Sequence, residues 1–352
     1  MKDTRENKNI SGIERAAHHK TNMDRTQYLR LDMNENIDSL PTEFIQSVFS
    51  SISGDMLATY PNQEKTTQIL ADYNRLEYQN ILLTNGSDGA INWVFETFIA
   101  ASDKVLLTNP TFAMYNVYGK IYDADVLTVN YESNLEFPYE EFMDRLNQDI
   151  KLAVVVNPNN PCGTVLEEEK LVSIIEKAHS NNTLLVVDEA YYYFYTETVK
   201  DYVKKYDNLI VLRTFSKVCA MAGLRVGYIM ADSKIIYSIK KVALSFDVNA
   251  VGLVFVNKLM ENQYIIDDLC KNVNDGKKFV CNELDQLNIP YVLGKGCFML
   301  IELHGDLHEI QQYFKEKGIL VSLALNKYIR INLGAPGKMQ LFINELKKGK
   351  FV

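Results

Sequence analysis

Residues 184–191 read Leu-Leu-Val-Val-Asp-Glu-Ala-Tyr, an apolar run of strand length that ends in an acid. A run that is apolar on both faces is typical of a strand buried between two helical layers. Residues 152–156 have the same character, and residues 167–178 between the two runs follow a helical pattern. Similar short runs lie at 81–83, 105–107, 126–129 and 209–212. This alternation predicts an α/β fold in which helices cover both faces of a mostly parallel sheet.

The length of the chain indicates more than one domain. It has 352 residues, whereas an ordinary domain has roughly 100 to 200. After about residue 246 long helical patterns precede three short strand candidates, which is typical of a smaller α+β domain. We therefore expect an N-terminal arm over residues 1–35, a large domain over 36–245 and a small domain, packed with the arm, over 246–352.

Composition excludes several classes of function. The chain has 37 Lys and Arg residues against 45 Asp and Glu, a formal net charge of −8, which argues against a nucleic-acid-binding surface or a polybasic membrane-binding face. No apolar run approaches the roughly 20 residues that span a bilayer, and the first residues lack the apolar core of a signal peptide. The five cysteines are scattered and form no C-x-x-C pair, which predicts reduced thiols and a cytoplasmic protein.

Two loops that follow predicted strands carry small and polar residues. Ligands bind at the carboxyl ends of parallel strands in open α/β sheets. Ser87 and Asp88, in the loop that follows the strand at 81–83, are suited either to an anion such as phosphate or to an ordinary capped turn. Asn160, in Asn-Pro-Asn-Asn-Pro-Cys-Gly over 157–163, could hold a ligand oxygen or serve a rigid structural turn.

Three charged residues sit at the ends of strands or within them. Asp188 ends a buried strand and needs a partner, which could be a protonated heterocyclic nitrogen, a metal ion or a structural cation. Lys217 follows the run at 209–212 and has the hydroxyls of Thr214 and Ser216 and the cation Arg225 nearby in sequence, so it could form a Schiff base beside a phosphate site. Arg330 lies in the short apolar strand at 328–331 and is suited to a carboxylate, structural or from a substrate.

Taken in order, these motifs resemble the fold-type I pyridoxal 5′-phosphate (PLP) enzymes, specifically the aminotransferase class I and II family in its histidinol-phosphate aminotransferase branch. The resemblance covers residues from about 31 to 334. It implies a seven-stranded large-domain sheet and a PLP-dependent aminotransferase in which Lys217 binds the cofactor covalently and serves as the catalytic residue. Asp188 would pair with the protonated pyridine nitrogen.

The resemblance also implies the other residues that contact the cofactor. Tyr191 and Asn160 would hydrogen-bond the phenolate oxygen of the ring, and Phe112 would stack on the ring. The phosphate would be held by the backbone of two residues and by three side chains: Ser87 and Asp88, and Ser216, Arg225 and, as a weaker candidate, Thr214.

Substrate and subunit contacts follow from the same resemblance. Arg330 would clamp the α-carboxylate of an amino-acid substrate, and Asn34 and Glu35 would enter the site from the arm as substrate-binding residues, beside Asn160. Tyr60 matches a tyrosine that the family supplies from the neighbouring subunit, which implies a homodimer with shared active sites.

One departure concerns the substrate. Enzymes of the branch that act on histidinol phosphate are expected to have an Arg near Ser322, which disfavours that substrate. A basic cluster in the arm could bind a phosphorylated or carboxylated substrate instead, or form a solvated tail: Arg15, His18, His19, Lys20 and Arg25. We expect no metal site, since His304 and His308 flank a predicted turn and have no evident third ligand.

The leading hypothesis is therefore an aminotransferase that moves an amino group from an amino-acid donor, glutamate above all, to a small oxo acceptor, phosphorylated or not, by a ping-pong reaction. A PLP-dependent decarboxylase of a phosphorylated amino acid would use the same residues. A non-catalytic PLP-binding regulatory protein is disfavoured, because every position that carries chemistry is filled.

Overall fold

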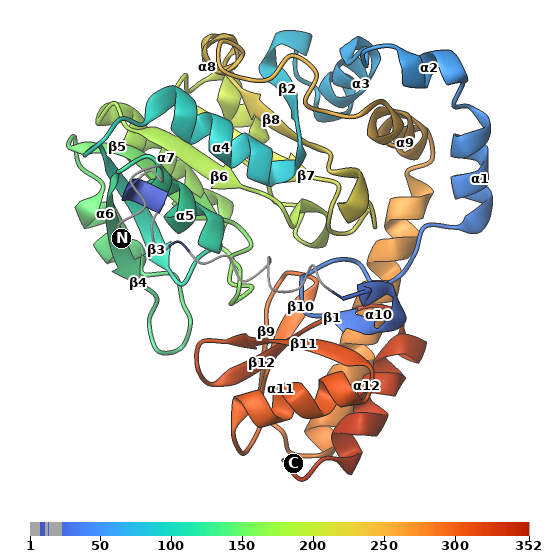
Figure 1. Ribbon diagram of the computed structural model, residues 1–352. Coiled ribbons are helices and arrows are strands. Elements are labelled where there is room, and N and C mark those ends of the chain that lie inside the picture. Colours follow the sequence, from blue (N-terminus) through green and yellow to red (C-terminus); the bar gives the residue numbers. More distant parts are fainter. Residues whose placement is uncertain (1–7, 11–12, 14–22, 352) are drawn as a thin grey trace, which may run out of the picture.

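The computed structural model describes residues 8–10, 13 and 23–351, and the predicted α/β fold is confirmed (Figure 1). Its main sheet has seven strands in the order β2-β8-β7-β6-β5-β3-β4. Neighbouring strands are parallel except β8, which runs antiparallel to both β2 and β7. The strands, in chain order, are β2 (Ile81–Thr84), β3 (Lys104–Asn109), β4 (Asp125–Asn130), β5 (Ile150–Val156), β6 (Leu184–Asp188), β7 (Leu209–Thr214) and β8 (Gly227–Ala231).

Helices cover both faces of this sheet because the buried strands are apolar on both sides. In β5, Val154 and Val156 share a core with α4, α5 and α8, whereas Ala153 and Val155 on the other face share a core with α1, α3, α6, α7 and α9. The helices of this part are α1 (Thr42–Ser50), α2 (Gly54–Ala58), α3 (Glu64–Asn74), α4 (Gly86–Phe98), α5 (Ala113–Ile121), α6 (Tyr139–Arg145), α7 (Glu168–Ser180), α8 (Ser233–Ile239) and α9 (Ala250–Glu261).

A second sheet of five strands has the order β1-β11-β12-β10-β9. The strand from the arm, β1, pairs in parallel with β11, and the other pairs are antiparallel. Its elements are β1 (Leu29–Leu31), β9 (Tyr291–Leu293), β10 (Phe298–Glu302), β11 (Ile319–Ala324) and β12 (Tyr328–Asn332), with α10 (Tyr264–Gln286), α11 (Leu307–Glu316) and α12 (Pro336–Lys348). Residues of all three helices and of β1, β10, β11 and β12 form a separate hydrophobic core.

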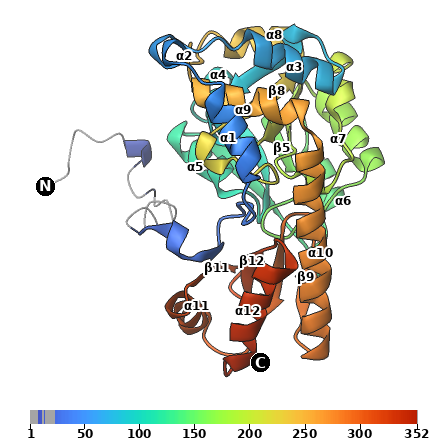
Figure 2. The same cartoon turned by 90° about the vertical axis from the view of Figure 1, so that its right-hand side faces the viewer.

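Helix α10 connects the two parts and runs from one to the other (Figure 2). Its first turns, with Ile265, Ile266 and Leu269, belong to the core of the seven-stranded sheet, and its later turns, with Val273 and Val280, belong to the second core. Helix α9 also packs on the first core, although it follows the boundary expected near residue 246. The division into an arm and two domains remains a prediction.

Short 3-10 helices complete the described elements: η1 (Lys8–Ile10), η3 (Arg25–Gln27), η4 (Tyr78–Asn80), η5 (Tyr192–Phe194), η6 (Lys200–Lys204) and η7 (Ala222–Leu224). Within residues 8–10, 13 and 23–351, no helix is both long enough and apolar enough to span a bilayer.

Candidate active site

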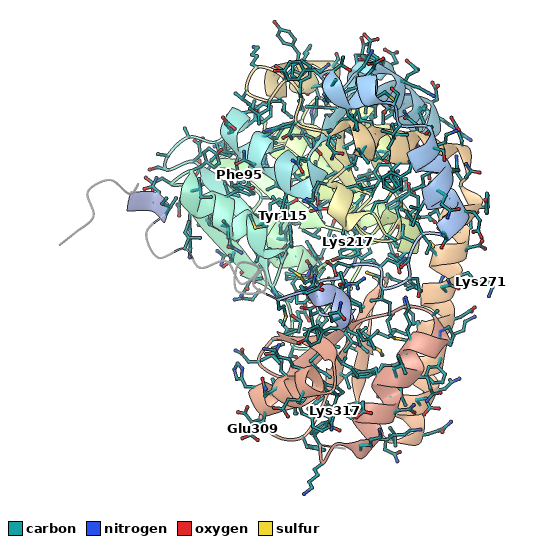
Figure 3. All side chains as sticks on the ribbon, turned by 45° about the vertical axis from the view of Figure 1, so that its right-hand side comes forward. Phe95, Tyr115, Lys217, Lys271, Glu309 and Lys317 are labelled. Carbon is teal, nitrogen blue, oxygen red and sulfur yellow. The ribbon has the colours of Figure 1, made fainter. Side chains whose placement is uncertain are left out.

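A cleft lies between the carboxyl ends of the parallel strands and the five-stranded sheet. It holds a cavity of about 470 Å³ lined by Asp32, Met33, Asn34, Pro110, Thr111, Phe112, Ala113, Asn160, Pro161, Lys217, Ser322, Leu323, Ala324, Leu325 and Arg330. A smaller cavity shares Phe112, Asn160 and Lys217 with it and is also lined by Ser87, Val156, Asp188, Ala190 and Tyr191. Figure 3 places Lys217 where the two parts of the molecule meet. The cleft therefore combines residues from both sheets.

Lys217 stands in the loop that follows β7 and lines both cavities. Removal from water disfavours the charged ammonium, and this desolvation lowers the pKa of Lys217 below its ordinary value; the positive charge of Arg330 also lowers it. The amine Nζ lies 5.7 Å from the centre of the Tyr191 ring. A lysine with a lowered pKa can act as a nucleophile and as a base near neutral pH.

Asp188 ends β6 and is 1% exposed. Its carboxylate accepts hydrogen bonds from the Tyr115 hydroxyl (2.9 Å) and from the Ala190 backbone N–H (3.0 Å). Burial raises the pKa of Asp188 to about 6, although both hydrogen bonds and the charge of Lys217 act in the opposite direction. A ligand cation against this carboxylate would stabilise its ionised form.

Tyr191 follows Asp188 by three residues and is buried. Its hydroxyl oxygen accepts a hydrogen bond from Asn34 Nδ2 at 2.8 Å. Its ring packs edge-on against Phe298 of β10, with the ring centres 5.3 Å apart. Tyr191 therefore contacts the arm, the second sheet and the smaller cavity at once.

Arg330 reaches the cleft from the middle of β12. Its Nη1 donates to Asn160 Oδ1 (2.8 Å) and its Nη2 to the Asp32 backbone carbonyl (2.9 Å). Its Nε is buried and has no hydrogen-bond partner among the described residues. An unpaired buried donor is costly, so this guanidinium is suited to bind an anion that accepts a hydrogen bond from Nε.

A second basic site lies at the first turn of α4. Gly86 begins this helix with a positive φ of 68°, and a Cβ atom there would lie 2.6 Å from Arg225 Nη2. Arg225 Nη1 donates to Ser216 Oγ (3.4 Å), which also accepts from Thr214 Oγ1 (2.9 Å). Backbone N–H groups at a helix start, a guanidinium and hydroxyls together favour a phosphate group.

The model of the aminotransferase class I and II family matches residues 26–346 of the chain. The chain belongs to this family. It is 31% identical over 328 residues to the histidinol-phosphate aminotransferase of Caldanaerobacter subterraneus, covering 91% of this chain and 92% of that protein. It is 30% identical to histidinol-phosphate aminotransferase 2 of Legionella pneumophila, covering 92% and 90%. The predicted reaction class and branch are confirmed, so this chain is a PLP-dependent aminotransferase, and neither the decarboxylase nor the regulatory protein is favoured.

The aminotransferase also shares its fold with solved structures. The histidinol-phosphate aminotransferase of Sinorhizobium meliloti in complex with pyridoxal 5′-phosphate aligns with a TM-score of 0.87 at 19% identity, covering 98% of this chain and 97% of that one. A putative histidinol-phosphate aminotransferase of Erwinia carotovora atroseptica aligns with a TM-score of 0.85 at 25% identity, covering 92% and 96%.

The charges of the aminotransferase cleft fit PLP. The site near Gly86 and Arg225 offers donors to a phosphate, buried Asp188 has no cation in hydrogen-bond contact among the described residues, and Lys217 lines the same cavity as Asp188. Phe112 lines both cavities and suits the predicted stacking role. These are the groups that a phosphate, a protonated ring nitrogen and an aldehyde require.

Tyr60 and Glu35, both predicted site residues, do not line the cleft cavities. Tyr60 is 78% exposed, stacks on Phe246 with ring centres 4.3 Å apart, and lines neither cavity. The Glu35 carboxylate accepts a hydrogen bond from Arg25 (2.8 Å) and lies 3.5 Å from Arg30. Glu35 thus holds the arm together and does not line the cleft cavities.

The basic cluster of the arm is only partly described. Arg15, His18, His19 and Lys20 lie outside the described residues. Arg25 is partly buried and pairs with both Asp32 (2.6 Å) and Glu35. Its guanidinium is therefore engaged within the arm, because two carboxylates surround it.

Sequence reasoning gave no role to Tyr115 or to the buried ion pair of Arg213 with Glu189. Arg213 Nη2 lies 2.8 Å from Glu189 Oε2, and both side chains are 2% exposed. The structural ion pair that was one alternative for Asp188 is therefore made by its neighbour, Glu189. Tyr115 and Asp188 are 73 positions apart, so only the fold reveals their contact.

Proposed function

We propose that this aminotransferase takes glutamate as its amino donor, transfers the amino group to a small oxo acceptor, and works as a homodimer. One observation carries the catalytic part of the proposal: Lys217 and Arg330 line one cavity, and Lys217 and Asp188 line the other. The walls of one cleft then carry an amine, a buried acid and a guanidinium N–H that has no hydrogen-bond partner among the described residues.

Each residue of the cleft has a proposed task with the cofactor bound. PLP supplies an electron sink for the charge that is left when the substrate Cα–H bond breaks. Asp188 would keep the ring nitrogen protonated, and Tyr191 and Asn160 would donate to the ring oxygen. Because burial lowers the pKa of Lys217 and so favours its neutral amine, Nζ would take the proton from the substrate Cα and act as the shuttle for it.

Arg330 and Asn34 would orient the substrate. The unpaired Arg330 Nε supplies a donor to the α-carboxylate, and a fixed carboxylate determines which bond at Cα faces Lys217. Asn34 Oδ1 is also buried with no hydrogen-bond partner in the described part of the chain. This oxygen would accept a hydrogen bond from the amino group of the substrate.

The acceptor that we propose is not the oxo partner of histidinol phosphate. Ser322 pairs with Arg330 across β11 and β12, at the place where an arginine is expected for that substrate. The cations that line the cleft cavities, within the described residues, are Lys217 and Arg330. Arg25 is held by Asp32 and Glu35. With Lys217 assigned to the cofactor and Arg330 to the α-carboxylate, a substrate phosphate would find no further cation on the described walls.

A screen of donors and acceptors, followed by mass spectrometry, tests this proposal. It should include glutamate, unphosphorylated ketones and aldehydes, their phosphorylated counterparts, and histidinol phosphate beside histidinol. We expect turnover with glutamate and no preference for the phosphorylated member of a pair. A kcat/KM about 100-fold higher for histidinol phosphate than for histidinol would contradict the proposal, because such a ratio requires a built phosphate site.

The proposed homodimer rests on large apolar side chains that are exposed in two stretches of the chain, residues 49–60 and 244–246, which meet where Tyr60 stacks on Phe246. They are Phe49, Met56, Leu57, Tyr60, Leu244 and Phe246, each at least 37% exposed. An exposed apolar surface of this kind marks an interface, and Tyr60 would then reach the cleft of the partner subunit. Mixing inactive Lys217→Ala with a Tyr60→Ala variant should restore roughly a quarter of the wild-type activity, because half of the dimers are mixed and each has one intact site. Unrestored activity in mixed dimers would contradict shared sites.

We also place the enzyme in the cytoplasm. All five cysteines are free thiols, which supports a reducing compartment.

A further inference from the structure

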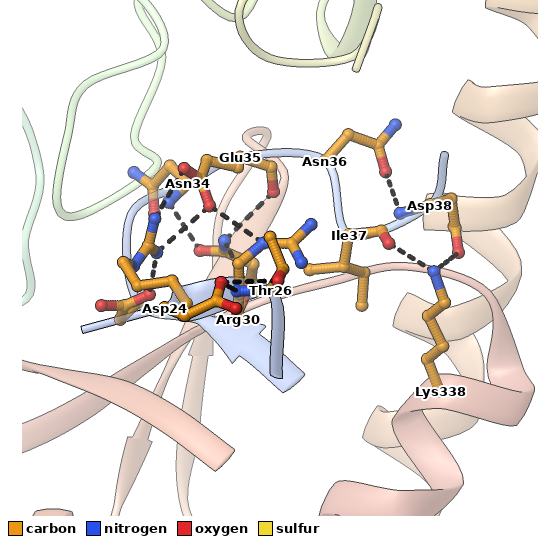
Figure 4. A network of polar contacts seen from close by, with 12 residues as sticks. Asp24, Thr26, Arg30, Asn34, Glu35, Asn36, Ile37, Asp38 and Lys338 are labelled. Carbon is orange, nitrogen blue, oxygen red and sulfur yellow. Dashed lines mark hydrogen bonds and ion pairs between the residues drawn. The ribbon is translucent and has the colours of Figure 1, made fainter. Parts of the chain in front are cut away.

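Residues 29–38 form a segment that we call the N-terminal strap, which begins with the edge strand β1 of the five-stranded sheet and ends in contact with the start of α12. Polar groups of the sheet and of α12 hold its backbone and side chains (Figure 4). Lys338 donates to the Ile37 carbonyl and lies 3.2 Å from Asp38 Oδ1, and the Ala335 backbone N–H donates to Asp38 Oδ2 at 2.8 Å. The strap is therefore fixed to the second sheet and its helices.

Asn332 makes the largest set of these contacts. It is fully buried at the end of β12 and shares a strand face with Arg330, two residues before it. Its Oδ1 accepts from the Asn34 backbone N–H (2.8 Å), and its Nδ2 donates to the carbonyls of Arg30 (3.3 Å) and Glu35 (3.1 Å). One amide side chain thus binds the strap on both sides of Asn34.

The strap in turn presents two amides to the loops of the seven-stranded sheet. Asn34 Nδ2 donates to the Tyr191 hydroxyl oxygen, and Asn36 Nδ2 donates to the carbonyl of Val218, the neighbour of Lys217. Asn34 adopts a left-handed conformation with φ of 58°, which is uncommon for a residue other than glycine. The hydrogen bond from its backbone N–H to Asn332 fixes this conformation.

We propose that Asn332 is a positioning residue for the aminotransferase reaction: it holds Asn34 so that the Asn34 amide donates to Tyr191 and the Tyr191 proton is directed into the cleft. This inference rests on the proposed contact of Tyr191 with the cofactor ring oxygen. A hydroxyl oxygen that already accepts from Asn34 has its own O–H left to donate elsewhere. The smaller cavity, where Tyr191 faces Lys217 and Asp188, is the side on which a ligand acceptor would lie.

The pH dependence of the bound cofactor's visible absorbance reads this hydrogen bond directly. A donor to the ring oxygen stabilises negative charge there. Loss of that donor should therefore raise the pKa of the nitrogen through which Lys217 would be joined to the cofactor. In the PLP-loaded enzyme, Asn332→Ala should raise the midpoint of the absorbance titration by about 0.5 to 1 pH unit. Asn332→Ser, which keeps a small polar side chain, should raise it in the same direction if the alanine variant does not fold.

Two further variants show whether Asn332 acts through Asn34. Asn34→Gly removes the amide and suits the positive φ, so it should raise the midpoint by itself. The double variant should then show no additional shift, because the two changes break one chain of contacts. Additive shifts would overturn the proposal.

Two controls separate the possible failures. Asp306→Ala removes the N-cap of α11. It should lower the free energy of unfolding by about as much as Asn332→Ala does, without moving the midpoint of the absorbance titration. An unchanged midpoint in Asn332→Ala together with a raised one in Tyr191→Phe would overturn the positioning role alone. An unchanged midpoint in Tyr191→Phe would overturn the proposed contact of Tyr191 with the cofactor and this inference with it.

Discussion

The two sheets position their side chains in the cleft in different ways. In the seven-stranded sheet, Asp188 ends β6 and Lys217 stands in the loop that follows β7, so strand order alone brings them to one edge. In the five-stranded sheet, Arg330 lies in the middle of a strand. Arg330 and Asn332 both donate hydrogen bonds to backbone carbonyls of the strap.

This contrast implies a division of tasks. The first sheet presents the groups that suit the cofactor, and the second presents the groups that suit the substrate carboxylate. Variants on the two sides should therefore fail differently, the first in cofactor chemistry and the second in substrate recognition.

Lys217→Ala should have the largest effect, with a loss of turnover of about 10⁴-fold or more, because the amine is both nucleophile and base. The covalent link to the cofactor should disappear as well, which mass spectrometry after borohydride reduction measures. Lys271→Ala, at an exposed lysine that pairs with Asp275, is the control and should retain full activity. Retained turnover in Lys217→Ala would contradict the assignment of the catalytic amine to the side of the seven-stranded sheet.

Arg330→Gln should lower kcat/KM for amino-acid substrates about 10- to 100-fold, since a charge-assisted pair with the carboxylate is lost. The visible spectrum of the bound cofactor should persist, unlike in Lys217→Ala. Arg145→Gln, at an exposed arginine of α6 that pairs with Glu141, should change neither quantity. If Arg330→Gln instead released the cofactor, the second sheet would have a cofactor task too.

Asp188→Asn should stabilise the cofactor-free protein at neutral pH while impairing the loaded enzyme. The folded-state pKa of Asp188, about 6, lies above the ordinary value of 3.8. Its contribution to stability is therefore present below about pH 4 and is lost as the pH rises through about 6. Urea unfolding at pH 4.5 and 7.5 should show the variant gaining on the wild type at the higher pH, on the order of 1–3 kcal/mol. An equal difference at both pH values would contradict this account of Asp188.

Tyr115→Phe should have the smallest effect, a rise of about 3- to 10-fold in the dissociation constant of PLP. The hydroxyl that it removes hydrogen-bonds Asp188 and opposes the rise in the pKa of that carboxyl. Tyr122→Phe is a matched control, because Tyr122 directly follows the same helix and its hydroxyl donates to Asn92 instead. Equal effects of the two changes would assign Tyr115 to packing.

The same contrast explains how far the sequence could be interpreted. Asp188 and Lys217 follow apolar runs, and strand ends meet at one edge, so their proximity could be predicted. The Asn332 contacts with Asn34 join residues 298 positions apart, and the engagement of Arg25 by Asp32 and Glu35 depends on how the arm turns. Such side-chain contacts leave no periodic pattern in the sequence.

The most direct test of the central claim is a single turnover of the PLP-loaded enzyme with glutamate and no acceptor. We predict one equivalent of 2-oxoglutarate per subunit and loss of the visible absorbance of the cofactor, which a suitable oxo acceptor should restore. Release of carbon dioxide from the substrate, or no change with glutamate or any other common amino donor, would contradict the account.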